Sequence, residues 1–182
     1  PGQRPHDLGK LATMTTDRPA STHRSAAHRA VVLHRPGPLD HDGAAGEALR
    51  LEQRPSPDPG DHEVRIDVDA CAVCRTDLQL CEGDLAARRL PVVPGHQIVG
   101  RVAAVGPAVT NLTVGDRVGV AWLAHACGHC RFCTRGRENL CETATFTGWD
   151  RDGGFAEQAT ADARFTYRLP DGIDPRAAAP LL

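Results

Sequence analysis

Aromatic side chains are scarce in this chain of 182 residues, which contains only Phe 4, Trp 2 and Tyr 1. Its formal net charge at pH 7 is -2, so neither sign of charge dominates. Proteins that bind nucleic acids rely on basic surfaces and on aromatic side chains that stack on bases. The composition therefore predicts no nucleic-acid partner, and it gives no reason to expect binding to an acidic membrane surface.

Long apolar runs are also lacking. The longest are far too short to span a bilayer, and no secretory signal precedes the expected fold. The seven cysteines are an odd number, and four of them have metal-binding spacing, which disfavours a secreted disulfide scaffold. These features predict a protein of the reducing cytoplasm with no membrane partner.

Glycine (18) and proline (14), by contrast, are plentiful, as expected for a β-rich domain with many turns. Val64, Ile66 and Val68 alternate with charged residues, which predicts a half-buried strand that leads to Cys71. Few helical periods are visible. The sequence thus predicts a mainly β fold with short helices (α+β), arranged as a small, partly open β-barrel. Further strands are expected at residues 30–34, 98–105 and 117–122.

The first part of the chain, residues 1–28, has the composition of a disordered lead-in. Pro, Arg, His, Ser and Thr dominate it, and no apolar period can be traced. Met14, the single methionine, is a candidate translation start inside this segment. The remaining residues are enough for one domain with its own core.

Four cysteines form the most specific motif of the sequence. They follow the spacing C-x2-C-x2-C-x7-C and are Cys127, Cys130, Cys133 and Cys141. Four thiolates with this spacing can surround one tetrahedral ion and leave no open position, which predicts a structural zinc site. Two alternatives are four unrelated buried cysteines and an iron–sulfur cluster. The common iron–sulfur run has a proline after its last cysteine, where this chain has Glu142.

A second candidate site combines Cys74, at the end of the predicted strand, with His96. Taken singly, a buried cysteine or a lone histidine is usually only a packed or hydrogen-bonded residue. Together they are two of the three protein ligands of a Cys2His catalytic zinc site. Thr76 and Asp77 add a hydroxyl that can relay a proton and a carboxylate that can orient a ligand.

With these motifs in this order, the chain resembles the N-terminal, GroES-like catalytic domain of the zinc-dependent medium-chain alcohol dehydrogenases. The resemblance covers about residues 28–182. It implies a catalytic domain at 29–175 and, at 176–182, the start of a connection to a Rossmann domain. The residues that carry it are 74–77, 95–96 with Gly100, 115–118, the four lobe cysteines and 153–157.

The resemblance implies roles for the residues of the second site. Cys74 and His96 match ligands of the catalytic zinc, Thr76 matches the hydroxyl that passes the alcohol proton outward, and Asp77 matches a carboxylate beside the zinc site. In close relatives the third ligand is a cysteine, which here would lie just past Leu182. The catalytic site is therefore expected to be incomplete within these residues.

Four further positions are also interpreted by the resemblance. Arg75 lies where relatives reach toward the cofactor pyrophosphate. Trp122 matches an aromatic wall that narrows the pocket for small primary alcohols, although a core aromatic is an equally good interpretation. Gln97 replaces a common glutamate, which leaves the zinc more electrophilic. Gln79 replaces a histidine of the proton relay, which predicts slower proton release or a route through water, because glutamine does not titrate.

The implied function is the oxidation of small alcohols to aldehydes, or the reverse, with hydride transfer to or from NAD or NADP. No G-x-G-x-x-G motif follows a strand, so the Rossmann domain is expected to be missing and the chain inactive alone. The resemblance also implies a homo-oligomer, a dimer or tetramer, at full length. The alternatives are a zinc-stabilised GroES-like binding module and a related reductase without catalytic zinc. Cys74 and His96 disfavour both.

Overall fold

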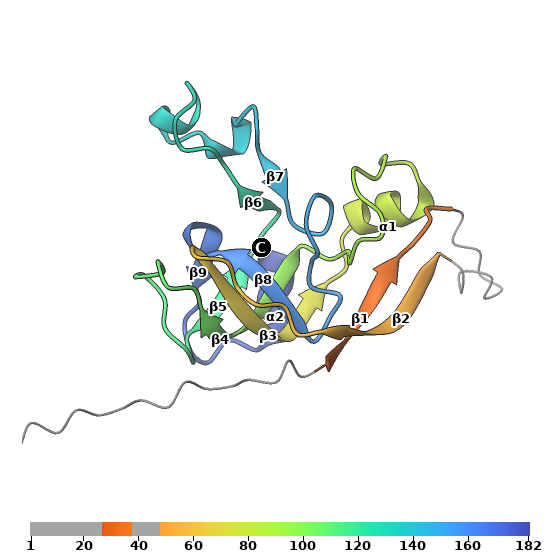
Figure 1. Ribbon diagram of the computed structural model, residues 1–182, viewed down its shortest axis with the longest axis horizontal. Helices are drawn as coiled ribbons and strands as arrows, with labels where there is room; N and C mark the ends of the chain where they lie inside the picture. The colour runs from red at the N-terminus through yellow and green to blue at the C-terminus, as the bar shows by residue number, and fades with distance from the viewer. Residues whose placement is uncertain (1–26, 38–47) are drawn as a thin grey trace, which may run out of the picture.

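The computed structural model describes residues 27–37 and 48–182 (Figure 1). Residues 1–26 of the predicted lead-in, including Met14, lie outside the described residues. Strand β1 (Ala27–Leu33) already contains Ala27 and His28, so regular structure includes the last two residues of the expected lead-in.

The centre of the fold is a five-stranded antiparallel sheet with the order β8-β3-β4-β5-β9. The sheet is curled and is formed by β3 (Glu63–Ala72), β4 (Gln97–Val105), β5 (Arg117–Val120), β8 (Gln158–Asp162) and β9 (Thr166–Arg168), the last two joined by a 3-10 helix (Ala163–Phe165). The predicted strands at 64–68 and 98–105 are confirmed as parts of β3 and β4. The strand predicted at 117–122 is shorter than expected, because β5 ends before Trp122.

The main core lies against one face of this sheet. Val64 and Ile66 are fully buried, and Val68 packs against the same cluster, as their alternation predicts. Val102, Val118 and neighbouring side chains from β4 and β5 complete the cluster. Each such aliphatic side chain contributes about 1.5–3 kcal/mol when it leaves water. This core fixes the end of β3, from which the chain enters the candidate catalytic site.

A two-stranded ribbon of β1 and β2 (Leu49–Pro55) lies beside the sheet (Figure 1). Its β1 strand is tied to the segment before β8, because the Val31 N–H donates to the Phe155 carbonyl at 2.8 Å and the Glu157 N–H donates to the Arg29 carbonyl at 2.9 Å. The sequence analysis did not predict β2. Its residues are mostly polar and half-exposed, so no apolar alternation reveals it.

Helix α1 (Arg75–Glu82) follows β3 directly. Its first turn is closed by Asp77, whose carboxylate accepts a hydrogen bond from the Cys74 N–H at 2.8 Å. Leu80 and Cys81 bury its inner face, and Gly83 ends it in a left-handed conformation. The helix therefore holds Cys74, Thr76 and Asp77 in one rigid turn.

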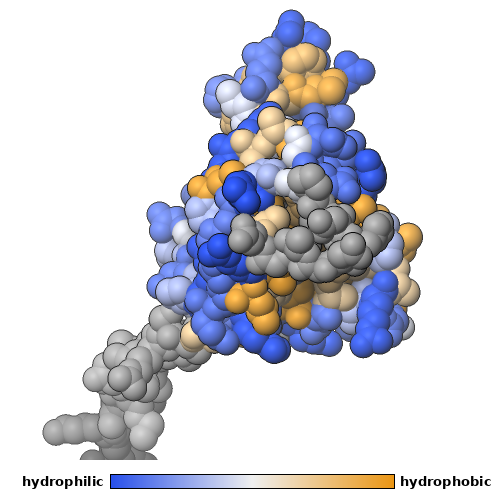
Figure 2. All heavy atoms as spheres, turned by 90° about the vertical axis from the view of Figure 1, so that its right-hand side faces the viewer, coloured by the Kyte–Doolittle hydropathy of each residue, from blue (hydrophilic) through white to orange (hydrophobic). Residues whose placement is uncertain are grey.

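The four-cysteine segment forms a lobe that projects from the sheet (Figure 1). A short ribbon of β6 (Leu123–His125) and β7 (Thr145–Phe146) carries it, and two 3-10 helices (Cys133–Arg135 and Glu138–Leu140) shape it. Figure 2 shows this lobe as the narrow upper part of the molecule, where an apolar patch lies among hydrophilic side chains.

The last residues form helix α2 (Pro175–Ala178) and a 3-10 helix (Ala179–Leu181). Ala178 and Ala179 pack with Val99 of β4, so this end of the chain lies against the sheet. None of the helices in the described ranges is long and apolar enough to cross a membrane.

Candidate metal centres

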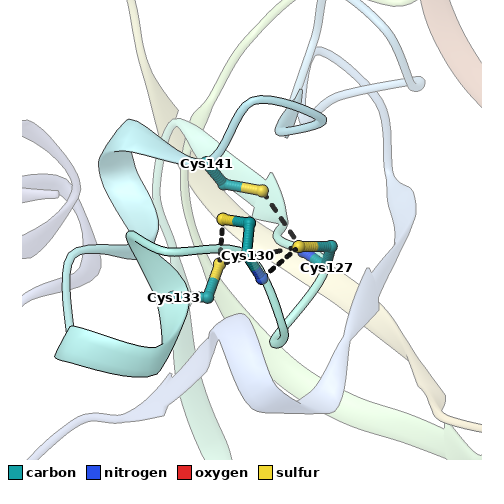
Figure 3. Close-up of side chains that lie close together, drawn as sticks. All are labelled: Cys127, Cys130, Cys133 and Cys141. Atoms are coloured by element: carbon teal, nitrogen blue, oxygen red, sulfur yellow. Dashed lines mark hydrogen bonds between the residues drawn. The ribbon is translucent and has the colours of Figure 1, made fainter.

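The four lobe cysteines converge on one point (Figure 3). Their Sγ atoms all lie within 4.8 Å of one another, and the Sγ of Cys133 lies 3.9 Å from that of Cys127 and 3.5 Å from that of Cys130. A tetrahedral Zn²⁺ with Zn–S bonds of about 2.3 Å requires sulfur atoms about 3.8 Å apart. The cluster therefore fits the metal that the spacing predicts, and four unrelated buried thiols do not explain it.

Main-chain N–H groups point at these sulfurs. The Cys127 N–H donates to the Cys141 Sγ at 3.4 Å, and the Cys130 N–H donates to the Cys127 Sγ at 3.3 Å. The Cys127 N–H and the Thr143 hydroxyl lower the pKa of Cys141 to about 6. Because the thiolate is the form that binds metal, these donors prepare Cys141 for an ion, whereas burial raises the pKa of Cys133 to about 12.

Two histidines, His125 and His129, lie next to the lobe cysteines in the sequence. His125 Nδ1 lies 3.0 Å from the Asp162 carboxylate, which also pairs with Arg164 at 2.8 Å. His129 is exposed. Neither belongs to the group of four cysteines within metal-binding distance.

At the second candidate site, Asp77 connects Cys74 with His96. Its side chain is 4% exposed, and its carboxylate accepts from the Cys74 N–H, from the Gly95 N–H at 3.1 Å and from His96 Nδ1 at 3.0 Å. A carboxylate without a proton can only accept, so His96 carries its proton on Nδ1. That tautomer leaves Nε2 free to bind a metal.

The surroundings of Cys74 and His96 shift the pKa values of the two groups in opposite directions. The Thr76 N–H, together with the Thr76 hydroxyl and His96, lowers the pKa of the Cys74 thiol. Burial opposes a charge on His96, but hydrogen bonding to Asp77 and the proximity of Cys74 outweigh it, so the pKa of His96 is raised. A divalent ion would bind these two groups in place of a proton, since thiolate and neutral imidazole are the forms that bind metals.

The loop that carries His96 is held by the glycine turn before β8. The Gly153 N–H donates to the Val93 carbonyl at 2.7 Å, and the Gly154 N–H donates to the Gly95 carbonyl at 2.8 Å. A Cβ on Gly153 would overlap the Gly95 carbonyl oxygen. Only glycine permits this approach, which positions His96 opposite α1.

Two other predicted residues have defined surroundings. Thr76 Oγ1 lies 3.8 Å from the Cys74 Sγ, so its hydroxyl is next to the candidate ligand. Arg75 has a side chain that is 65% exposed and lies 3.9 Å from Glu82 and 3.8 Å from Asp84. These contacts do not test the expected role of Arg75 toward a cofactor, so that role stays a prediction.

An aromatic wall stands beside His96. Trp122 meets His96 edge to face at 4.9 Å, and it stacks on Phe146 at 4.9 Å and on Trp149 at 5.7 Å between ring centroids. The guanidinium of Arg88 lies 3.8 Å from the centre of Trp149. Trp122 was predicted from the sequence, but its aromatic partners were not. Because the chain has so few aromatic residues, the second tryptophan, Trp149, was a usable sequence signal for a partner of Trp122.

Gln97 links the site to the end of the chain. Its Nε2 donates to the main-chain oxygen of Leu182 at 2.6 Å and more weakly to that of Pro180 at 3.4 Å. A glutamate at this position has no proton to donate to those oxygens near neutral pH. The amide of Gln97 therefore has a structural use in this chain.

Comparison with known proteins identifies relatives along most of the chain. The model of the alcohol dehydrogenase GroES-like domain matches residues 60–171. A probable alcohol dehydrogenase of Mycobacterium tuberculosis is 46% identical over 169 residues, covering 90% of this chain and 46% of the relative. An alcohol dehydrogenase of Geobacillus stearothermophilus is 43% identical, covering 73% of this chain and 40% of the relative. The chain thus spans less than half the length of these relatives.

Solved structures support the same assignment. The cobalt- and zinc-bound thermostable alcohol dehydrogenase of Pyrobaculum aerophilum superimposes with a TM-score of 0.75 at 32% identity, covering 86% of this chain and 45% of that one. The predicted mainly β, GroES-like fold is confirmed by this likeness and by the family match. The chain belongs to the alcohol dehydrogenase GroES-like domain family.

Proposed function

We propose that this chain is the zinc-binding, substrate-positioning part of a longer alcohol dehydrogenase that interconverts small alcohols and aldehydes. The observation that carries the proposal is the Asp77 network, which fixes one tautomer of His96 and lies next to Cys74. A binding module has no use for a thiol and an imidazole prepared in this way. The alcohol dehydrogenases among its relatives support the assignment.

Zn²⁺ held by Cys74 and His96 would supply a Lewis acid that favours loss of the alcohol proton. The residues of the chain do the rest. Asp77 keeps the His96 proton on Nδ1, and the Thr76 hydroxyl accepts the substrate proton and passes it outward. Trp122 limits the width of the pocket, which favours small substrates. Gln79 cannot take up this proton, so the proton leaves through water.

The nicotinamide cofactor, NAD or NADP, belongs to the same proposal as the hydride acceptor or donor. Arg75 is the residue of this chain proposed to reach its pyrophosphate. We assign residues 29–175 to the catalytic domain and residues 176–182 to the connection toward a cofactor domain of the longer enzyme. That enzyme is proposed to work as a homo-oligomer in the cytoplasm, whereas this part alone turns over no substrate.

A Cys74→Ser variant of the longer protein tests the proposal. Native mass spectrometry is expected to give two zinc ions per chain for the parent and one for the variant, and alcohol-dependent reduction of NAD or NADP is expected to be lost. Cys81→Ser is the matched control, because Cys81 is a buried thiol outside both centres. A Cys74→Ser variant that keeps both ions and its activity overturns the assignment.

A further inference from the structure

The aromatic wall beside His96 is supported from the side of α1. Trp149 stacks on Trp122, with 5.7 Å between the ring centroids and an angle of 16° between the ring planes. The same residue packs against the buried cluster that includes Leu80 of α1. Its Nε1 donates to the Ala86 carbonyl at 2.9 Å. Trp149 therefore connects Trp122 with α1 and with the segment that follows this helix.

Arg88 strengthens this support. Its guanidinium lies 3.8 Å from the centre of the Trp149 ring, within the roughly 6 Å over which a cation is attracted to the face of an indole. Arg88 also pairs with Asp150 at 3.2 Å, and the Asp150 carboxylate accepts a hydrogen bond from the Phe146 N–H at 2.9 Å. One arginine is thus bound both to the ring of Trp149 and to the turn that carries it.

Trp122 has ring contacts of two kinds. It meets His96 edge to face, with an angle of 73° between the rings, whereas Phe146 and Trp149 stack on it with angles of 23° and 16°. A rotation of the Trp122 indole that widens the space beside His96 would give up contact with the stacked rings, and such ring pairs are favourable beyond the area that they bury. The position of Trp122 therefore depends on the rings behind it.

We infer that Trp149 and Arg88 are positioning residues that determine which alcohols the enzyme accepts. They hold Trp122 beside His96, and through Trp122 they keep the space next to the metal narrow. Both act on the substrate only through Trp122, so neither is a catalytic residue. The inference rests on the proposed function, because it concerns the substrate pocket of that same site.

The kinetic test compares benzyl alcohol with ethanol as substrates of the longer protein. Trp149→Leu removes the stacked ring and is expected to raise the ratio of kcat/KM for benzyl alcohol to that for ethanol about tenfold, the lower end of what a small change in pocket size gives. Trp149→Phe keeps a flat ring over Trp122 and should stay close to the wild type. A general loss of stability would lower both kcat/KM values and leave their ratio unchanged.

Circular dichroism first establishes which variants fold. Arg88→Met, at a side chain that is 48% exposed, should raise the same ratio about threefold, as expected for the loss of an exposed cation–π contact. It decides alone if Trp149→Leu does not fold. Arg89→Met is the matched control, because Arg89 pairs with Asp152 at 3.4 Å, and it should leave the ratio unchanged.

Crystal structures of the same variants test the positioning without any measurement of activity. In Trp149→Leu, the Trp122 ring should leave its 4.9 Å contact with His96 or occupy two rotamers, whereas Trp149→Phe should keep the contact. A Trp122 ring that does not move in Trp149→Leu overturns the inference, and so does an unchanged ratio of kcat/KM. A wild-type enzyme that oxidises neither alcohol overturns the proposed function instead, while the position of Trp122 still decides whether Trp149 holds it.

Discussion

Asp77 satisfies three hydrogen-bond donors at once, and all three belong to the proposed catalytic site. Two are main-chain N–H groups, of Cys74 and Gly95, and the third is His96 Nδ1. The carboxylate thus fixes the start of α1 and the loop before β4 with respect to each other. A carboxylate near the predicted metal was expected from the sequence. Its hydrogen bonds to main-chain N–H groups were not, because the bond from Gly95 depends on tertiary contact.

Asp77→Asn is expected to lower the free energy of unfolding by about 1–3 kcal/mol, because the amide turns a donor toward buried donors. Urea unfolding followed by circular dichroism measures the change. Asp84→Asn is the control, since its side chain is 63% exposed and its loss should cost less than about 0.5 kcal/mol. Equal destabilisation by the two variants would contradict the role given to Asp77.

Asp162 should make the stability depend on pH. Burial opposes its ionisation, but Arg164 and His125 outweigh burial and lower the pKa of Asp162 from 3.8 to about 2. A lowered carboxyl pKa stabilises the fold above pH 3.8, and this contribution disappears as the pH falls through about 2. Arg164 is 55% exposed, so screening reduces the contribution to about 1 kcal/mol.

The comparison of wild type with Asp162→Asn isolates this effect. Urea unfolding at pH 6 should give a stability difference of about 1 kcal/mol, and the difference should shrink as the pH is lowered from about 4 toward 2. Both proteins carry the same cysteine lobe, so loss of metal at low pH is common to them. A difference that stays constant over this range would show that Asp162 acts through packing.

At the level of elements, we expect the lobe between β6 and β7 to depend on a bound metal ion. Its interior segment is mostly polar and exposed between Thr134 and Asn139. The buried cluster of the lobe is small: Ala126, Cys133 and Cys141 pack with Phe165, which belongs to the 3-10 helix after β8. Such a segment has too little apolar surface to fold by itself, so we expect metal binding to supply its folding free energy.

Cys130→Ser is expected to release one zinc ion per chain and to loosen the lobe while the sheet stays folded. Native mass spectrometry counts the ions, and amide hydrogen exchange should become faster in residues 126–144 and remain slow in β3 and β4. Cys71→Ser, outside the lobe, should change neither quantity. Iron in the purified protein, or a lobe that stays protected without metal, would contradict this account.

The elements also show where sequence reasoning succeeded. β3 and β4 were predicted because one face of each is buried, so that period-2 patterns or apolar runs appear. β2 was missed, since its side chains are half-exposed on both faces. α1 was missed because eight residues are too short to show a helical period, and its start is set by Asp77. The cysteine cluster was predictable from spacing alone, whereas the aromatic wall joins three separate segments.

For the whole molecule, the proton path of the proposed enzyme gives a further test. Gln79 lies in α1, three residues after Thr76. In the longer protein, Gln79→His should raise the turnover of alcohol above pH ~6.5, where a histidine is neutral and can accept the proton. An increase of at least about tenfold is expected, which is below the roughly 100-fold that a well-positioned base gives at the lower end.

Stopped-flow measurement of cofactor reduction over a pH series provides the comparison. Gln53→His, at an exposed site in β2, is the control and should have no effect. A Gln79→His profile that matches the wild type at every pH would show that proton release does not limit the reaction.

The contact between Gly153 and Gly95 has a consequence for how this gene can vary. Every glycine codon begins with GG, and every single-base change that alters the residue introduces a Cβ. At Gly153 each of these changes would force the loop of His96 away, so a mutational scan should find almost no tolerated codon there, not even one for alanine. At Gly37, none of the described residues lies within 4 Å of the same added atom, so this position should accept alanine freely. Two glycines written with the same codons thus differ in their evolutionary freedom.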